Sequence, residues 1–322
     1  MLDNKTSMSI SNYNGRLTPG NIWLFPVCFM LLAFCFHLWT DAIRWPVENE
    51  AQQRDMNTAI AMTLLTGVFW AGVRAVHQNI ASTLLHILTL QKQSGEFEHH
   101  RITLSRKFVS QLLVVGFIAP LMPLFYIISE GLFTRMDEAA VFGITLVAIP
   151  FWLFFLLFIT QVTTNTNYVF SVAFKGSRQA PEDVPIYNAV FDMALRNTHF
   201  ALIVIAIIPI FWFNRTITPL DSMLVVMTAG VLVLYLFIPV IRSYVKIRAL
   251  GRLARAAIDE KVNTLIRHEG QGFSASKRLE LLQCQREQTK HVIKRRQKRT
   301  LVFSLSLLPL SLFLIFLLEK LG

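Results

Sequence analysis

The sequence predicts an all-α polytopic membrane protein with seven transmembrane helices and cytosolic helical hairpins. Three observations predict this fold class. Hydrophobic residues make up 53% of the 322 residues. Charged residues make up only 16%, whereas a soluble domain carries about 25%. The apolar residues also gather in separate stretches, most of which approach the roughly 20 residues that a helix needs to cross a bilayer.

Seven apolar stretches follow one another along the chain, and each is predicted to be a transmembrane helix. The fifth stretch is short, and we expect its helix to extend at one or both ends. The stretches are Ile22–Thr40, Thr58–Val76, Phe108–Ile128, Ala139–Thr160, Phe200–Phe213, Ser222–Val240 and Leu301–Leu318.

The charges between the stretches predict the orientation, because Lys and Arg in short loops stay on the cytoplasmic side. Three connections are acidic or neutral and are predicted to be external: Asp41–Asn57, Ser129–Glu138 and Asn214–Asp221. The connections that alternate with them are basic and are predicted to be cytosolic: Arg74–Lys107, Gln161–His199 and Ile241–Thr300. With seven spans, this alternation places the N-terminus inside and the C-terminus outside.

Each basic connection continues the helical pattern of the preceding span and is interrupted near its middle. The interruptions are "QSGEFEHH", "GSRQAPEDVP" and "GQGFSAS", which contain residues that end helices. We therefore predict three helical hairpins. The resulting organisation is a cytosolic tail (1–21), a six-helix membrane bundle (22–240) with hairpins at about 75–107 and 161–199, a basic cytosolic hairpin (241–300), and a seventh transmembrane helix with an external C-terminus (301–322).

The third hairpin contains sixteen Lys and Arg against five Asp and Glu, and this surplus equals the net charge of +11 of the whole chain. One interpretation is a solvated pair of helices. The other is a docking arm for an acidic cytosolic protein, because opposite charges steer and orient association. The residues proposed for docking are Arg252, Arg255, Lys277 and Arg278.

A basic cluster precedes the last apolar stretch and is predicted to lie at the membrane surface. It consists of Lys294, Arg295, Arg296, Lys298 and Arg299. Each such residue near anionic lipid headgroups contributes about 1 kcal/mol, and the cluster would hold this side of the last helix in the cytosol. A nucleic-acid partner is disfavoured, because no aromatic residues are interleaved with these charges.

A polar run leaves the fourth stretch and has two interpretations. Its members could line a pore or a cytosolic vestibule, or they could donate hydrogen bonds to neighbouring helices. The run consists of Thr160, Gln161, Thr163, Thr164, Asn165, Thr166 and Asn167.

The sequence contains no motif that indicates an enzyme, a cofactor or a metal site. The segment "EFEHHR" lacks the histidine pair of a zinc protease, which needs H-E-x-x-H. No G-x-S-x-G and no Walker A motif occurs. His77 and His199 are both predicted near the inner surface, but no further ligand pattern accompanies them. We therefore predict no catalytic residue, cofactor or metal.

These patterns lead to one main hypothesis and two alternatives. The main hypothesis is a non-enzymatic integral membrane subunit of a larger translocation, secretion or channel assembly, in a bacterial inner membrane. The first alternative is a self-sufficient channel, transporter or pore-forming effector, whose cavity the polar run and His37 would line. The weaker alternative is a lipid-modifying membrane enzyme. A second copy of the chain is a further candidate partner.

Overall fold

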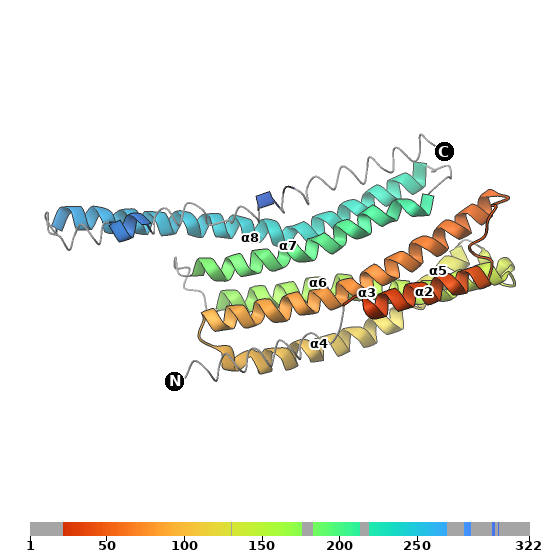
Figure 1. Ribbon diagram of the computed structural model, residues 1–322, viewed down its shortest axis with the longest axis horizontal. Helices are drawn as coiled ribbons and strands as arrows, with labels where there is room; N and C mark the ends of the chain where they lie inside the picture. The colour runs from red at the N-terminus through yellow and green to blue at the C-terminus, as the bar shows by residue number, and fades with distance from the viewer. Residues whose placement is uncertain are drawn as a thin grey trace.

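The computed structural model of the chain describes residues 22–129, 131–175, 183–212, 219–268, 280–284, 298–299 and 302. These residues are 90% helical and contain no strand, which confirms the all-α prediction. The helices lie alongside one another in an elongated bundle (Figure 1). In order they are α2 (Leu24–Trp39), α3 (Glu50–Leu90), η1 (Ser94–Glu96), α4 (Phe97–Ile118), α5 (Leu121–Ser129), η2 (Leu132–Arg135), α6 (Ala139–Lys175), α7 (Val184–Ile207), η4 (Ile208–Trp212) and α8 (Pro219–His268).

Within the part of the chain that the structure describes, four helical segments are long and apolar enough to cross a membrane, and they indicate a membrane protein. They are Glu50–Leu90, Ser94–Ile128, Ala139–Ala173 and Val184–Phe211, and α2 is a shorter apolar helix. The sixth predicted stretch lies within α8. The seventh lies outside the described residues except for Val302. The count of seven spans and the orientation therefore stay predictions.

The structure shows the helical extensions that the sequence predicts beyond the apolar stretches. Helix α3 continues to Leu90, and α6 continues to Lys175. The short fifth stretch is part of α7, which begins much earlier, at Val184. At the other end of α3, the Asn49 side chain caps the helix, since its Oδ1 accepts a hydrogen bond from the backbone N of Gln52 at 2.9 Å.

The third apolar stretch contains a short interruption in its helix. It is divided at Ala119 and Pro120 into α4 and α5. Proline has no backbone N–H, and its ring clashes with the carbonyl four residues earlier, so it interrupts the helical hydrogen bonds.

Helix α3 is central, because it packs against α2, α4, α6 and α7, while α8 packs against α7. Phe69 of α3 is 2% exposed, and its ring centroid lies 5.1 Å from that of Phe155 and 5.7 Å from that of Phe158 on α6. A second apolar cluster joins α7 to α8 through Phe191, Ile247 and their neighbours.

The bundle has two ends, which we name by residues at each. The Arg135 end holds η2 and the connection between α2 and α3. The Lys92 end holds the turn between α3 and α4, where Lys92 has a φ of 61°. In the orientation predicted from the loop charges, the Arg135 end is external and the Lys92 end is cytosolic.

Candidate functional site

A group of polar side chains joins α3, α4 and α6 inside the bundle, and we call it the Gln161 cluster. Oε1 of Gln161 lies 2.6 Å from Nε2 of His77 and accepts from Nδ2 of Asn165 at 2.7 Å. Nε2 of Gln161 donates to Oε1 of Gln111. Nε2 of Gln111 donates to Oγ1 of Thr164 at 2.8 Å. Since an amide oxygen only accepts, the pairing with Gln161 requires His77 to carry its proton on Nε2.

The cluster is buried and therefore constrains how the three helices pack. Gln161 is 1% exposed and Asn165 is 3% exposed. A buried amide without a hydrogen-bond partner costs about 1 to 3 kcal/mol. The three helices must consequently keep the arrangement in which Gln161 meets both His77 and Gln111.

The structure spreads the predicted polar run over several faces of α6. Gln161 and Thr164 form hydrogen bonds to neighbouring helices, as one of the two interpretations expects. Thr160 and Thr163 instead donate to carbonyls of the preceding helical turn, those of Leu156 and Ile159. The remaining members also differ in burial: Asn165 and Thr166 are buried and Asn167 is exposed.

Sequence reasoning did not identify Gln111 as a member of this cluster. A signal was present, since Gln111 is the one amide side chain in the apolar stretch Phe108–Ile128. An amide in such a stretch seeks a partner on a neighbouring helix. The sequence places His77 near the inner surface without indicating a partner, and in the structure its ring packs edge-on against Phe108 and its Nε2 is bound to Gln161.

A cavity of about 350 Å³ adjoins the Gln161 cluster between α3 and α4. Its polar lining residues are Arg74, His77, Gln78, Arg101, Ser105 and Asn165. The guanidinium of Arg101 is paired with Glu98 at 2.6 Å, and that of Arg74 lies 5.3 Å from the ring centroid of Phe25. Apolar side chains such as Leu104 and Phe108 also line the cavity, and Asn165 connects it to the predicted run.

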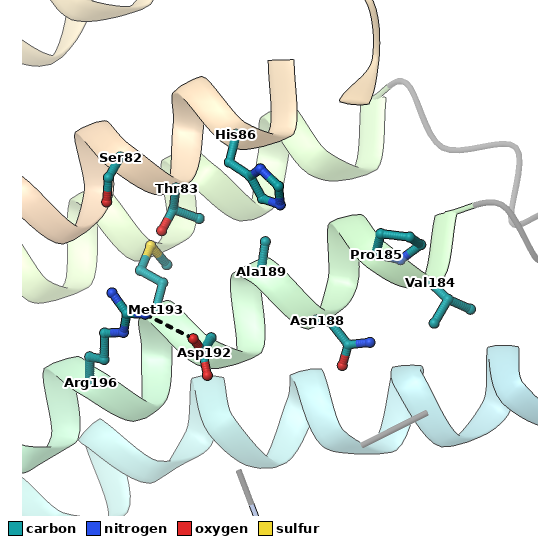
Figure 2. A pocket seen from close by; sticks show the side chains of 10 residues that line it. All are labelled: Ser82, Thr83, His86, Val184, Pro185, Asn188, Ala189, Asp192, Met193 and Arg196. Carbon is teal, nitrogen blue, oxygen red and sulfur yellow. Dashed lines mark hydrogen bonds and ion pairs between the residues drawn. The ribbon is translucent and has the colours of Figure 1, made fainter. Parts of the chain in front are cut away.

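A wider groove of about 470 Å³ lies between α3 and α7, nearer the Lys92 end. Figure 2 shows His86 projecting from α3 toward the space between the two helices. On α7, Nη2 of Arg196 is bound to Oδ2 of Asp192 at 3.0 Å. This exposed pair contributes only about 0.3 to 0.5 kcal/mol. The groove therefore offers hydrogen-bonding groups but no concentration of one charge.

Two of the four predicted docking residues lie on α8. Arg252 is exposed and Arg255 is half-buried, while Lys277 and Arg278 lie outside the described residues. Of the predicted membrane-surface cluster, Lys298 and Arg299 are exposed. Its other members, Lys294, Arg295 and Arg296, also lie outside the described residues. Both assignments stay predictions.

Among the described residues, no group of three or more His, Cys, Asp or Glu side chains could hold a metal ion. His37, which the pore hypothesis included, is fully buried near the end of α2. The side chain of His199 is not described. The expectation that the protein takes no cofactor stays a prediction from the sequence.

No protein-family model, curated protein or solved structure matches the chain. The function must therefore be argued from the geometry of this molecule.

Proposed function

We propose that the protein is a non-enzymatic integral membrane subunit of a larger assembly, and that α8 presents a basic surface to an acidic partner. The length of α8 carries this proposal. It is one helix of 50 residues, which corresponds to about 75 Å at 1.5 Å per residue. Figure 1 shows that it extends well past the helices beside it.

The packing of α8 separates a held part from a projecting part. Phe191 and Tyr187 of α7 form an apolar cluster with Ile247 and Leu250 of α8. Val184, the first residue of α7, packs against the same cluster. Helix α8 continues to His268, so about 27 Å of helix follows Leu250.

The projecting part and the turns before it carry positive charge. Arg242, Arg248 and Arg252 are exposed. Burial, and to a smaller extent the neighbouring charge of Arg242, lowers the pKa of the Lys246 ammonium group, because both disfavour its charged form. A partner with a complementary acidic surface would be steered to this helix and held in one register.

The bundle itself is suited to hold α8 in place. Phe69 and Phe158 fill its centre, and the Gln161 cluster fixes α3, α4 and α6.

The rival function, a channel or transporter, draws support from the cavity beside Asn165. We favour the assembly subunit, because packed aromatic side chains close the contact between α3 and α6. We place the protein in a bacterial inner membrane with the Lys92 end in the cytosol.

Purification in a mild detergent followed by mass spectrometry tests the proposal. The test variant changes the four docking residues to Gln: Arg252, Arg255, Lys277 and Arg278. The matched control changes four other basic residues, all exposed: Lys92, Arg106, Lys107 and Lys175. We expect the wild type and the control to retain a stoichiometric acidic partner and the test variant to lose it at least about tenfold.

Equal capture by the test variant would contradict the docking role of α8. Recovery of the wild type as a homo-oligomer alone would favour the channel or transporter. In that case ion or solute flux into liposomes becomes the decisive measurement, with Asn165→Ala as the first variant because Asn165 lines the cavity.

A further inference from the structure

A third cavity, independent of α8, lies toward the Arg135 end of the bundle. It has a volume of about 410 Å³ and is lined by residues of α3, α5, α6, α7 and the adjoining 3-10 helices. This volume falls within the range of about 300 to 1,000 Å³ that small-molecule sites occupy. Its walls include Leu65, Phe69, Phe151, Trp152, Phe155 and Phe211. The walls are therefore mainly aromatic and aliphatic.

The two threonine hydroxyl groups of the walls are already bound within their own helices. Oγ1 of Thr58 donates to the carbonyl oxygen of Arg54 at 2.7 Å. Oγ1 of Thr145 donates to the carbonyl oxygen of Val141 at 2.8 Å. A polar group in this space would lose its hydrogen bonds to water and find these donors engaged, which disfavours its burial. The interior consequently selects an apolar ligand.

Charged groups lie at one edge of the cavity, where Arg54 and Asp55 line it. Asp55 accepts from Nη2 of Arg135 at 2.9 Å, and Arg135 also binds Glu138 at 2.7 Å. Arg54 contacts Asp55 only at 3.5 Å, through Nε. Three hydrogen bonds therefore tie Arg135 to two carboxylates, whereas the Nη groups of Arg54 remain available to an anion at this edge.

We infer that this cavity binds one acyl chain of an anionic amphiphile, with the chain among the aromatic walls and the acidic headgroup at Arg54. The walls belong to helices that are long and apolar enough to cross a membrane, so the ligand would enter from the bilayer. Pro123 and Ile127 of α5 contribute to the lining.

The headgroup can come from two sources with the same chemistry, the carboxylate of a free fatty acid or the phosphate of a phospholipid. The experiment uses palmitic acid and phosphatidylglycerol, each carrying a diazirine near the methyl end of an acyl chain. Purified protein in detergent is irradiated with each, and labelled peptides are identified by mass spectrometry. We expect labels on α3 and α6 residues that line the cavity, such as Phe69 and Trp152.

Two variants and a matched control make the result decisive. Ala148 lines the cavity and is 5% exposed, so Ala148→Phe should fill the space and reduce labelling about tenfold. Leu146 lies two residues away and is 47% exposed, so Leu146→Phe should leave labelling unchanged. Arg54→Gln should weaken competition by unlabelled palmitic acid about tenfold but leave competition by neutral hexadecanol unchanged.

If only the fatty acid labels the cavity, the ligand is a free fatty acid. If only phosphatidylglycerol labels it, the ligand is a phospholipid. Either result supports the site. Labels that spread equally over exposed positions, or that persist in Ala148→Phe, would overturn it. If Ala148→Phe does not fold, the competition experiment with Arg54→Gln decides alone. If Arg54→Gln weakens competition by hexadecanol as much as competition by palmitic acid, the headgroup assignment is overturned. None of these outcomes depends on the docking role of α8.

Discussion

Arg135 and Asp55, eighty residues apart in the sequence, form an ion pair at one end of the bundle, where Nη2 of Arg135 donates to Oδ2 of Asp55 at 2.9 Å. The side chains are 28% and 14% exposed. The pair joins the short helix η2 to the long helix α3. It therefore fixes the connection between the third and fourth apolar segments against the centre of the bundle.

Replacing Asp55 by Asn should destabilise the protein by about 1 to 2 kcal/mol, because a partly buried charged hydrogen bond is lost. Thermal unfolding in detergent, followed by circular dichroism, measures this loss. The control is Glu48→Gln, which removes an ion pair between Glu48 and Arg44. The Glu48 side chain is 73% exposed. It should cost less than about 0.5 kcal/mol. Equal losses in the two variants would contradict a structural role for Asp55.

The same ion pairs predict a dependence of stability on pH. The hydrogen bond from Arg135 lowers the pKa of the Glu138 carboxyl below 4.5. A carboxyl whose pKa is lower in the folded state stabilises the fold above its unfolded pKa, and this stabilisation is lost as pH falls through the folded pKa. The unfolding temperature should therefore drop below about pH 4.5, and less steeply in Glu138→Gln. If the unfolding temperatures of the wild type and the variant change with pH in parallel, Glu138 contributes nothing to the pH dependence of stability.

The Gln161 cluster predicts an effect larger than that of one hydrogen bond. Gln161→Leu removes the amide that His77, Gln111 and Asn165 all contact. It should cost about 2 kcal/mol or more, since buried polar groups would lose their partner. Thr163→Val is the control, because Thr163 donates only to the carbonyl of Ile159 in its own helix. It should change stability by less than about 0.5 kcal/mol.

Gly143 predicts a steric effect between α2 and α6. A Cβ at Gly143 would lie 2.8 Å from Oγ1 of Thr40 and 3.3 Å from the ring of Phe36. Gly143→Ala should therefore destabilise the protein by about 1 to 3 kcal/mol, and Thr40→Ala in the same chain should recover part of the loss. Gly116→Ala is the control, since nothing lies within 4 Å of its Cβ position. It should be neutral or stabilise α4 by about 0.5 to 1 kcal/mol.

The predicted orientation can be tested with reporter fusions. A reporter that is active only in the periplasm should be active at Met136 and at Gly322, and inactive at Lys92 and at Gly176. The reason is that basic connections stay in the cytosol. An inactive fusion at Gly322 alone would mean that the last apolar stretch does not cross the membrane. Reversed activities at all four positions would mean that the orientation is wrong.

The helix limits were largely predictable, because they depend on local signals. Hydrophobic stretches and the helical period predict α3 and α6 well beyond their apolar parts, and Gly176 follows the last residue of α6. The break at Pro120 was not predictable in the same way. Pro150 and Pro239 lie inside continuous helices, so the presence of a proline does not tell whether a helix is interrupted.

The functional groups were predictable only in part. The polar run predicted that α6 would present hydrogen-bonding side chains, but the identity of the partners depends on which helices pack against it. His77 and Gln111 come from α3 and α4, and no sequence spacing relates them to Gln161. The apolar cavity near Arg54 was not predicted at all. A cavity is space that packing leaves unfilled, and it has no pattern of its own in the sequence.

The length of α8 also makes it a mechanical lever. Pro239 lies inside this helix, and a proline is a common position for bending. About 44 Å of helix follows it at 1.5 Å per residue. Because Ile247 and Leu250 hold this part of α8 against α7, a bend of about 10° at Pro239 would carry α7 along and swing the far tip by about 8 Å. Small rearrangements among the membrane helices would thus be amplified at the tip, and a load applied to the tip would be transmitted back through α7 to the bundle.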